Sequence, residues 1–159
     1  MKRYPYFPPK QLMYGFAPPE PLSVTIPLNC RFDEVDVLGM VWHGRYASYF
    51  EDARMSLGEK YGIDYIAFHD AGVIVPIKQM HVDYMAPLAF KERFHVTASL
   101  VWSEAARMNI VYRIRDMQGN VKTTGYTVQL FMLTNNKLCM TKPDFYAAFC
   151  ERWKNGKLA

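Results

Sequence analysis

The sequence predicts an α+β domain in which one long helix lies against a curved antiparallel sheet. Three observations lead to this prediction: a period-two strand pattern near the start of the chain, a single helical apolar stripe after it, and four further strand-like segments with short links. Short links between successive strands favour antiparallel pairing. The helix must bury its apolar stripe, and the concave face of the sheet is the only large surface available to it.

The first strand is predicted from Leu22 to Asp33, because apolar and polar residues alternate there, and Pro27 places it at a sheet edge or a bulge. A change of period then predicts an amphipathic helix that starts at Tyr46 and is bracketed at its end by Gly58 and Gly62. A short second helical piece is expected soon after it. The apolar stripe of the long helix consists of Tyr46, Tyr49, Phe50, Ala53 and Leu57.

Alternation predicts four more strands, and Gln118-Gly119-Asn120 marks a hairpin turn between the last two. A terminal helix is expected from Pro143, with Phe145, Phe149 and Trp153 on its apolar face. The four strands are expected at Val73 to about Tyr84, Glu92–Ser103, Arg107–Asp116, and Val121 to about Leu133.

The chain of 159 residues is long enough for one domain with a substantial core. We expect residues 22–159 to form that domain. Residues 1–21 are expected to form an extended arm, since seven of the ten prolines fall within the first 27 residues. Disorder of this arm is the competing interpretation.

Composition excludes several classes of protein. No run of about 18 uncharged apolar residues exists, which argues against a membrane span. The formal net charge of +4 is small and dispersed, unlike a nucleic-acid-binding surface. The three cysteines show no C-x-x-C spacing, so no disulfide framework or zinc site is indicated. With no apolar signal segment at the start, we expect a cytoplasmic protein without a metal ion.

The link between the first strand and the helix is the most informative segment for chemistry. The amides of Trp42, His43 and Gly44 open the helix, and such N–H groups can stabilise a carbonyl oxygen that gains negative charge. Asp36 can act beside that carbonyl as a nucleophile or as a general base toward water. Gly39 allows the tight turn between them. The combination favours acyl transfer.

Structural interpretations compete with these roles. Asp36 can be a solvated or capping acid, and His43 a cap or surface histidine; Asp33 and Glu34 are expected to be solvated. The large apolar residues of the link indicate a pocket wall or a subunit contact. No G-x-S-x-G, P-loop or dinucleotide glycine pattern is present.

The motif Asp36-x-x-Gly39-x-Val41-Trp42-His43-x-x-Tyr46, followed by Tyr49-Phe50-Glu51-x-Ala53-Arg54, resembles the signature of the hot-dog-fold acyl-CoA thioesterases. The closest groups are the hydroxybenzoyl-CoA thioesterases and the bacterial thioesterases associated with the Tol–Pal system. A second block, Met80-His81-Val82-Asp83-Tyr84-Met85-Ala86-Pro87-Leu88, supports the resemblance, which runs from about Ile26 to Leu133.

The resemblance implies a hot-dog fold, with a five-stranded antiparallel sheet around the long helix, and hydrolysis of an acyl-CoA to a free acid and CoA. Coenzyme A is then part of the substrate, and no other cofactor is implied. Asp36 matches the catalytic carboxylate. His43 matches the residue whose backbone N–H polarises the thioester carbonyl. The positions implied to form the oxyanion hole or to contact substrate are Gly39, Val41, Trp42, Gly44 and Tyr46.

The resemblance also implies a homodimer, often assembled into a homotetramer, with active sites at the subunit interface. Val35 and the pair Val37-Leu38 depart from many relatives and put the acyl pocket in question. Arg107, Arg113 and Lys122 are candidates for binding CoA phosphates, although surface solvation also explains them. Two alternatives remain open: a hydratase or dehydratase of the same fold, and a non-catalytic protein that binds acyl-CoA or acyl carrier protein.

Overall fold

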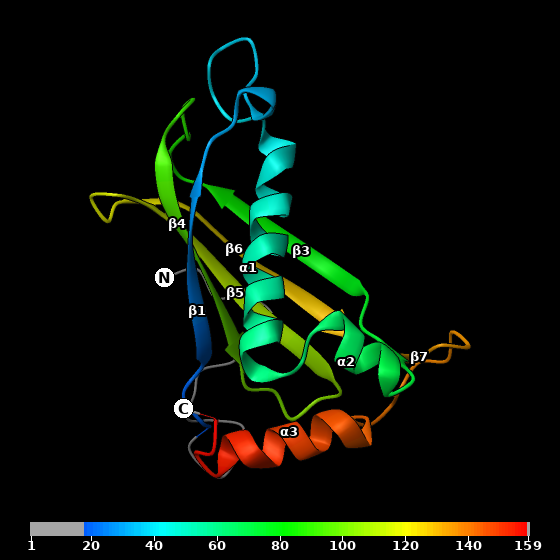
Figure 1. Ribbon diagram of the computed structural model, residues 1–159. Helices are drawn as coiled ribbons and strands as arrows, with labels where there is room; N and C mark the ends of the chain where they lie inside the picture. The colour runs from blue at the N-terminus through cyan, green and yellow to red at the C-terminus, as the bar shows by residue number, and fades with distance from the viewer. Residues whose placement is uncertain (1–17, 159) are drawn as a thin grey trace.

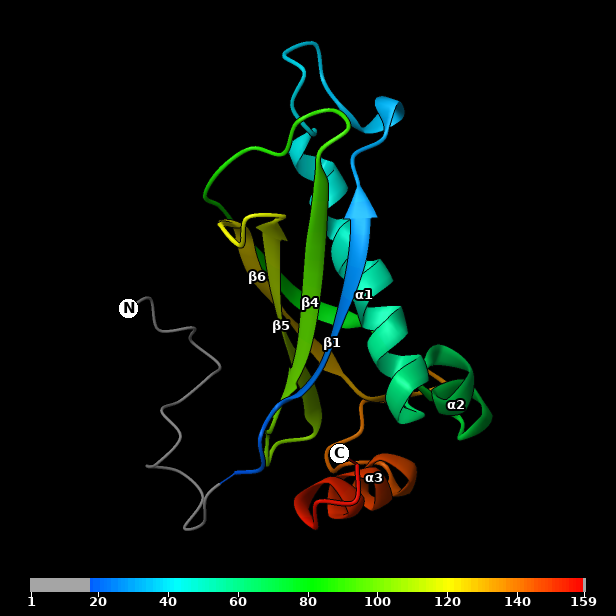
Figure 2. The same cartoon turned by 60° about the vertical axis from the view of Figure 1, so that its left-hand side comes forward.

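The structure is a computed structural model that describes residues 18–158. Most of the predicted arm, residues 1–21, therefore lies outside the described residues. The described chain forms a five-stranded antiparallel sheet with one long helix packed along a single face (Figures 1 and 2). This confirms the α+β class.

The strand order of the sheet is β1-β4-β5-β6-β3, and every neighbouring pair is antiparallel. The hairpins β4-β5 and β5-β6 join strands that follow one another in the chain, as expected from short links. However, β3 and β4 are not neighbours, because between them the chain crosses from the β3 edge to the position beside β1, the opposite edge strand. The strands are β1 (Leu22–Asn29), β3 (Ile77–Tyr84), β4 (Arg93–Val101), β5 (Arg107–Asp116) and β6 (Val121–Leu130).

The first strand was predicted too long. β1 ends at Asn29 rather than Asp33, because the chain turns inward at the buried Cys30 and forms the 3₁₀ turn η1 (Phe32–Glu34). Phe32, predicted on the apolar face of the strand, is 79% exposed. Pro27 does lie on an edge strand, where its missing N–H costs no ladder bond.

The segment predicted as one strand from Val73 is broken in the structure. A short strand, β2 (Val73–Ile74), pairs with β7 (Met132–Leu133) in a separate two-stranded sheet, and β3 begins only after Pro76. Proline cannot donate to a ladder, so the chain changes sheet there. The predicted last strand divides in the same way, into β6 and β7.

Helix α1 (Tyr46–Tyr61) buries the predicted stripe completely: all five of its residues are at most 3% exposed. Phe50 stacks on Tyr112 of β5, with ring centroids 4.4 Å apart, which fixes the helix over the centre of the sheet. The helix ends at Gly62, whose left-handed φ of +69° lets its N–H donate to the carbonyl of Gly58.

Two further helices lie near the end of the sheet at which α1 ends (Figure 1). Helix α2 (Tyr65–Asp70) follows α1 after a short turn, and α3 (Asp144–Lys154) crosses below. The predicted start of α3 is confirmed, with Pro143 as its cap residue. Trp153 of α3 packs edge-on against Trp102, with centroids 5.2 Å apart.

Candidate functional site

The link between β1 and α1 folds into a tight hairpin at the N-terminal end of the helix. Val35 and Val41 face each other in a β-bridge, and the Asp36 N–H donates to the Met40 carbonyl at 2.8 Å. Gly39, at φ +74°, makes the turn, and its N–H donates to the Asp36 carbonyl at 3.0 Å. The two legs thus hold each other through backbone bonds, so the position of the loop is defined by the chain itself.

The carboxylate of Asp36 is oriented by this same loop. Its Oδ1 accepts the N–H of Leu38 at 2.8 Å and that of Met40 at 3.4 Å. Within the part of the chain that the structure describes, Oδ2 has no hydrogen-bond partner. The side chain is exposed in the single chain. One oxygen is therefore fixed while the other remains available to a ligand.

The three amides that open the helix differ in whether they already donate a hydrogen bond within the chain. The Trp42 N–H donates to the Glu34 carbonyl at 2.9 Å, so this amide is already used. The following 3₁₀ turn η2 (His43–Arg45) starts with the Arg45 N–H bonded to the Trp42 carbonyl at 2.9 Å. The N–H groups of His43 and Gly44 precede that bond and have no acceptor inside the turn. They are the two remaining donors of the expected oxyanion hole.

The side chains around these amides restrict the space beside them. The indole of Trp42 lies over Gly44, where a Cβ would come 2.2 Å from the ring. The imidazole of His43 is exposed, with its ring centroid 5.0 Å from that of Trp42. The His43 carbonyl accepts the hydroxyl of Tyr84 at 2.8 Å, which ties the end of β3 to the start of the helix.

Glu34 is buried, which contradicts the expectation that it is solvated; Asp33 is exposed as expected. The Glu34 Oε2 accepts the hydroxyl of Tyr49 at 2.8 Å and the N–H of Arg31 at 2.8 Å. Burial, reinforced by the negative charge of Glu34, raises the pKa of Tyr49 above its usual value. The carboxylate thus links the Asp36 hairpin to the buried face of α1.

Val41 and Tyr46 are placed inside the fold rather than beside open space. Val41 is 6% exposed, and its N–H donates to the Leu88 carbonyl at 2.9 Å. Tyr46 is 2% exposed, and its hydroxyl accepts the N–H of Leu88 at 3.3 Å. Both residues brace the site against the β3–β4 connection.

The three candidate phosphate-binding cations are not brought together. Arg107 starts β5 and Lys122 lies near the start of β6, so the antiparallel pairing puts them at opposite ends of the hairpin. Lys122 forms an ion pair with Glu92 at 3.0 Å. Arg113 is exposed on the face of the sheet opposite the helix.

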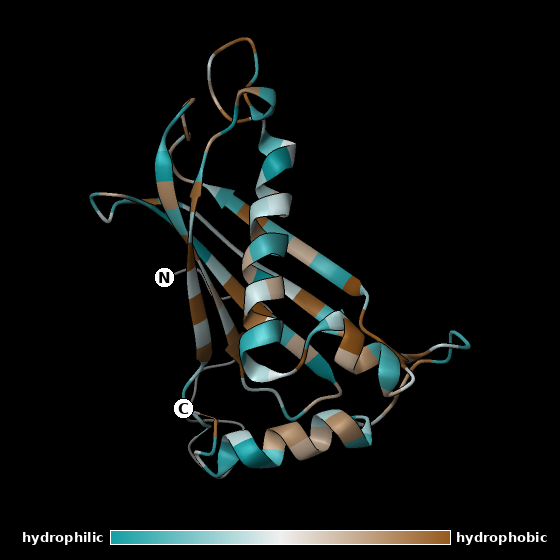
Figure 3. Cartoon of the chain, in the orientation of Figure 1, coloured by the Kyte–Doolittle hydropathy of each residue, from teal (hydrophilic) through white to brown (hydrophobic). Residues whose placement is uncertain are grey.

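Exposed apolar side chains surround the Asp36 hairpin, and hydrophobic segments are visible on this loop in Figure 3. Phe32 packs edge-on against Phe90 of the β3–β4 connection, with centroids 5.7 Å apart. We call the following residues the loop patch: Phe32 (79% exposed), Val37 (101%), Leu38 (72%), Trp42 (51%), Met85 (64%) and Phe90 (41%).

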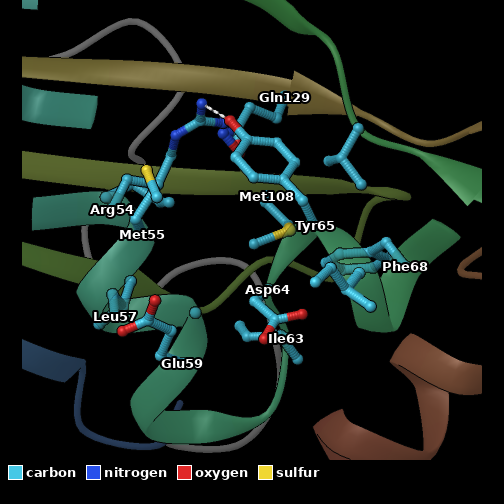
Figure 4. A pocket seen from close by; sticks show the side chains of 14 residues that line it. Arg54, Met55, Leu57, Glu59, Ile63, Asp64, Tyr65, Phe68, Met108 and Gln129 are labelled. Carbon is cyan, nitrogen blue, oxygen red and sulfur yellow. Dashed lines mark hydrogen bonds between the residues drawn. The ribbon is translucent and has the colours of Figure 1, made fainter. Parts of the chain in front are cut away.

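A second feature lies at the other end of α1, where a cavity of about 140 Å³ opens between the helix, α2 and the sheet (Figure 4). Its walls are mainly apolar. Arg54, Glu59 and Asp64 also line it. The most deeply buried polar side chain of the lining is Gln129 of β6, which is 1% exposed and whose Nε2 has no hydrogen-bond partner. The apolar wall residues include Leu57, Ile63, Phe68, Val75, Met108 and Ile110.

Comparison with known proteins decides the family. A model of the Thioesterase-like superfamily matches residues 30–149, most of the chain. The protein belongs to this family. Membership places it among the thioester hydrolases and confirms the hot-dog fold that the motif around Asp36 implied.

Solved structures and a curated protein agree with the family assignment. A DHNA-CoA thioesterase from Staphylococcus aureus is 26% identical, with a TM-score of 0.71 over 81% of this chain and 89% of that one. A 1,4-dihydroxy-2-naphthoyl-CoA thioesterase from Synechocystis shares the fold, at 16% identity and a TM-score of 0.70, with 81% of this chain and 96% of that chain covered. An Aquifex aeolicus protein provisionally named an esterase is 26% identical over 68% of this chain and 83% of its own length.

The described part of this thioesterase shows neither a metal-binding cluster nor a membrane-spanning helix. Residues 18–158 contain no group of three histidine, cysteine or acidic side chains positioned to hold a metal ion. Within the same range, no helix is both long and apolar enough to cross a bilayer.

Sequence reasoning missed two functional candidates in this thioesterase. The role of Glu34 was hidden because a loop acid is usually solvated, whereas the pairing with Tyr49 depends on the fold. Gln129 could have been found, since it occupies an inward-facing position of a strand, where a polar residue is unusual.

Proposed function

We propose that the protein is an acyl-CoA thioesterase in which Asp36 and the N–H groups of His43 and Gly44 act on the thioester carbonyl. The observation that supports this most directly is the hairpin geometry: Asp36 is oriented through one oxygen, and two unpaired amides begin the turn on the other leg. The named solved neighbours act on aromatic CoA thioesters, which favours CoA as the carrier.

The hairpin brings these groups to the same end of the helix. Val35 and Val41 face each other, so Asp36 and His43 lie on opposite legs, and the Glu34 carbonyl accepts the N–H of Trp42, the residue directly before His43. A reacting carbonyl needs about 3 Å to its attacking oxygen and about 3 Å to its oxyanion donors. We therefore place the thioester group between the Asp36 carboxylate and the amides of His43 and Gly44.

The reaction follows from these positions. Asp36 Oδ2 either attacks the carbonyl carbon or removes a proton from the water that attacks it. The carbonyl π electrons move to the oxygen, where the His43 and Gly44 amides stabilise the negative charge. Collapse of this intermediate breaks the carbon–sulfur bond and releases the CoA thiolate. In the nucleophilic route, water then hydrolyses the acyl-aspartyl anhydride and restores Asp36.

We further propose that the site is completed by a second copy of the chain. The loop patch exposes many large apolar side chains beside Asp36, and such contiguous patches usually mark contacts. Strand β3 is an edge of the sheet with eight residues available for pairing. Antiparallel pairing of two β3 strands gives a homodimer; further assembly into a tetramer stays a prediction.

A reducing compartment such as the cytoplasm suits this function. All three cysteines lie in the described part of the chain, and each carries a free thiol. Proteins of oxidising compartments more often pair their cysteines.

The test of this function is thiol release from a panel of aromatic and aliphatic acyl-CoAs by the wild type, Asp36→Asn and Asp33→Asn. Asn keeps the shape of Asp36 but cannot attack or accept a proton in the same way, so kcat should fall by about 100- to 10,000-fold. Asp33 is the matched control, because it is an exposed acid of the same loop whose partners are Arg31 and Arg45.

Undiminished turnover by Asp36→Asn would remove this residue from the mechanism. An equal loss in both variants would indicate that charge near the loop, rather than the Asp36 oxygen, supports activity. Dehydration or hydration of the acyl group without thiol release, or binding without turnover, would favour the two alternatives instead.

A further inference from the structure

The face of the sheet opposite α1 carries buried side chains, although no described helix lies on it. Phe50 of α1 stacks on Tyr112, and a Cβ at Gly125 would contact the Phe50 ring, so Tyr112 and Gly125 face the helix. Successive side chains of a strand point to opposite faces. Tyr126 and Val128 of β6 therefore lie on the face away from the helix, which we call the outer face.

Three side chains of β5 and β6 form a buried strip on the outer face, which we call the outer strip. Asn109 pairs with Val128, and the exposed fractions of Asn109, Tyr126 and Val128 are 2%, 2% and 3%. Among the described residues, α1 lies on the other face, α2 beside it and α3 at the end of the sheet (Figures 1 and 2). An antiparallel sheet face without a layer on it is solvated. The outer strip therefore requires a cover.

The outer strip also contains a polar atom that needs a donor. Within residues 18–158, the buried Asn109 Oδ1 accepts no hydrogen bond. The neighbouring Tyr126 hydroxyl, in contrast, accepts from the Nε2 of Gln79 at 3.0 Å. A buried acceptor without a donor is costly. We therefore expect the cover to bring an N–H group to Asn109.

The burial does not extend over the whole outer face, and the rest of the face disfavours a second copy as the cover. Val111, the next outward residue of β5 after Asn109, is half-buried, and Arg113 is exposed. Arg115 follows on the same face. A second copy stacked on this face would bring its own arginines toward the same charges, and like charges repel across an interface.

The described chain begins at the end of the sheet where the outer strip lies. Leu22, the first residue of β1, pairs with the residue of β4 that precedes Val101, and Val101 pairs with Asn109. The Glu20 carbonyl accepts the Nε1–H of Trp153 at 2.9 Å, which holds this entry against α3. The chain therefore enters the sheet level with the outer strip.

Residues 1–17, which we call the N-terminal segment, have a suitable length and composition for the cover. Neighbouring strands lie about 4.8 Å apart, so the three steps from β1 to β6 span about 14 Å, which about five extended residues can cross. Pro5, Pro8 and Pro9 lack N–H groups, so fewer backbone donors lose water when such a chain lies on a sheet. The segment has no acidic residue and five aromatic ones. The aromatic residues are Tyr4, Tyr6, Phe7, Tyr14 and Phe16.

We propose that the N-terminal segment binds across the outer face as an extended chain. Its aromatic side chains pack on the outer strip, and one of its backbone N–H groups donates to Asn109 Oδ1. This cover excludes assembly through the stacking of two outer faces. The outer strip lies at the end of the sheet away from Asp36, so its cover does not depend on the thioesterase reaction.

Photo-cross-linking in the full-length protein tests this contact. p-Benzoylphenylalanine is placed at Val111, which lies on the outer face opposite Tyr126, and mass spectrometry identifies the cross-linked peptides. We expect cross-links to residues 1–17 of the same chain, which a mixture of isotope-labelled and unlabelled chains distinguishes from those to a second copy. The same replacement at Asp52, an exposed residue of α1, should give no cross-link to the N-terminal segment.

Alkylation of a thiol placed in the outer strip gives a second readout. In Val128→Cys, the new thiol should be protected by the N-terminal segment. Replacing the five aromatic residues of the segment with serine should raise the alkylation rate of this thiol by about tenfold or more, because the apolar contacts that cover it are lost. Replacing Lys2, Arg3 and Lys10 with serine is the matched control in the same segment and should leave the rate unchanged.

Cross-links from position 111 that reach only residues 18–159, or only a second copy, would overturn the proposal. The second of these results would identify the outer face as an interface between copies of the chain. An equal alkylation rate with and without the aromatic residues would also overturn it, since the segment would then not cover the outer strip.

Discussion

The two ends of helix α1 are built in opposite ways. At the N-terminal end, backbone hydrogen bonds shape an open hairpin, and Asp36 is exposed among exposed apolar side chains. At the C-terminal end, side chains enclose a cavity in which Gln129 is fully buried. The N-terminal end of α1 exposes the proposed reacting groups, whereas the C-terminal end borders an enclosed cavity.

This difference places the proposed reacting groups and the enclosed cavity at opposite ends of one element. The helix has 16 residues. At 1.5 Å per residue it spans about 24 Å, too far for one small acyl group to contact both ends. In the proposed dimer, antiparallel pairing of β3 strands would bring the cavity end of one copy toward the Asp36 end of the other.

The strongest way to break this arrangement is to separate the copies while leaving each chain folded. Met80 lies in the middle of β3 and is 37% exposed. In Met80→Glu, two carboxylates would approach across the paired strands and repel each other. We expect a monomer by light scattering and a fall in kcat/KM of about 100-fold or more, since the second copy would no longer help to hold the substrate against Asp36.

Met117→Glu is the control, because Met117 is 55% exposed at the β5–β6 turn, away from the β3 edge. A monomer with full activity would show that one chain carries a complete site.

The helix and the paired core of the sheet were predictable because their patterns are local. The α1 stripe and the inward residues of β4 and β5 are all buried, as periodicity indicated. The ends of the strands were not predictable in this way. Phe32 continues the alternating pattern of Leu28, but it lies beyond Asn29, the last residue of β1 that pairs with β4. The crossing from β3 to β4 also has no local signal, because it depends on which edge remains open after β1 pairs with β4.

The Asp36 hairpin and the cavity also differ in how far the local sequence reveals them. Asp36, Gly39 and His43 fall within one short segment, so a motif could point to them. The cavity is assembled from α1, α2, β5 and β6, and no spacing within one segment reveals it. Glu34 was misjudged because its partner, Tyr49, lies 15 residues away on the buried face of the helix.

The rigidity of the catalytic end can be measured through Cys30, which is 2% exposed at the base of the hairpin. Burial, followed by the negative charges of Glu92 and Glu34, raises the pKa of this thiol to about 11. Relative to an ordinary thiol of pKa 9.0, its thiolate fraction at pH 8 is about 100-fold lower. Alkylation by iodoacetamide, followed by mass spectrometry, should be slower by at least this factor than in the urea-unfolded chain.

The raised pKa also gives a direction for stability. The native thiol binds its proton more tightly than the unfolded thiol, so this contribution is complete below pH 9 and is lost as the pH rises toward 11. If Cys30 reacts at pH 8 as fast as in the unfolded chain, the hairpin end opens freely and is not rigid.

The smallest effects are expected from alanine substitutions at two turn glycines, which test whether the backbone conformation of the hairpin matters for activity. Gly39 in the hairpin and Gly119 in the β5–β6 turn both have positive φ, +74° and +88°, and at neither position would a Cβ contact another group. Alanine should therefore cost each site only the strain of the left-handed conformation, about 1 kcal/mol in the free energy of unfolding. Urea titration of both variants measures this cost.

Activity should distinguish the two glycines although their stability losses are similar. In Gly39→Ala, the turn that positions Asp36 relaxes away from positive φ, and the bonds from Leu38 and Met40 to Oδ1 weaken with it. We expect a fall in kcat at saturating acyl-CoA for Gly39→Ala and none for Gly119→Ala. Equal activity of the two variants would mean that the hairpin does not position the carboxylate.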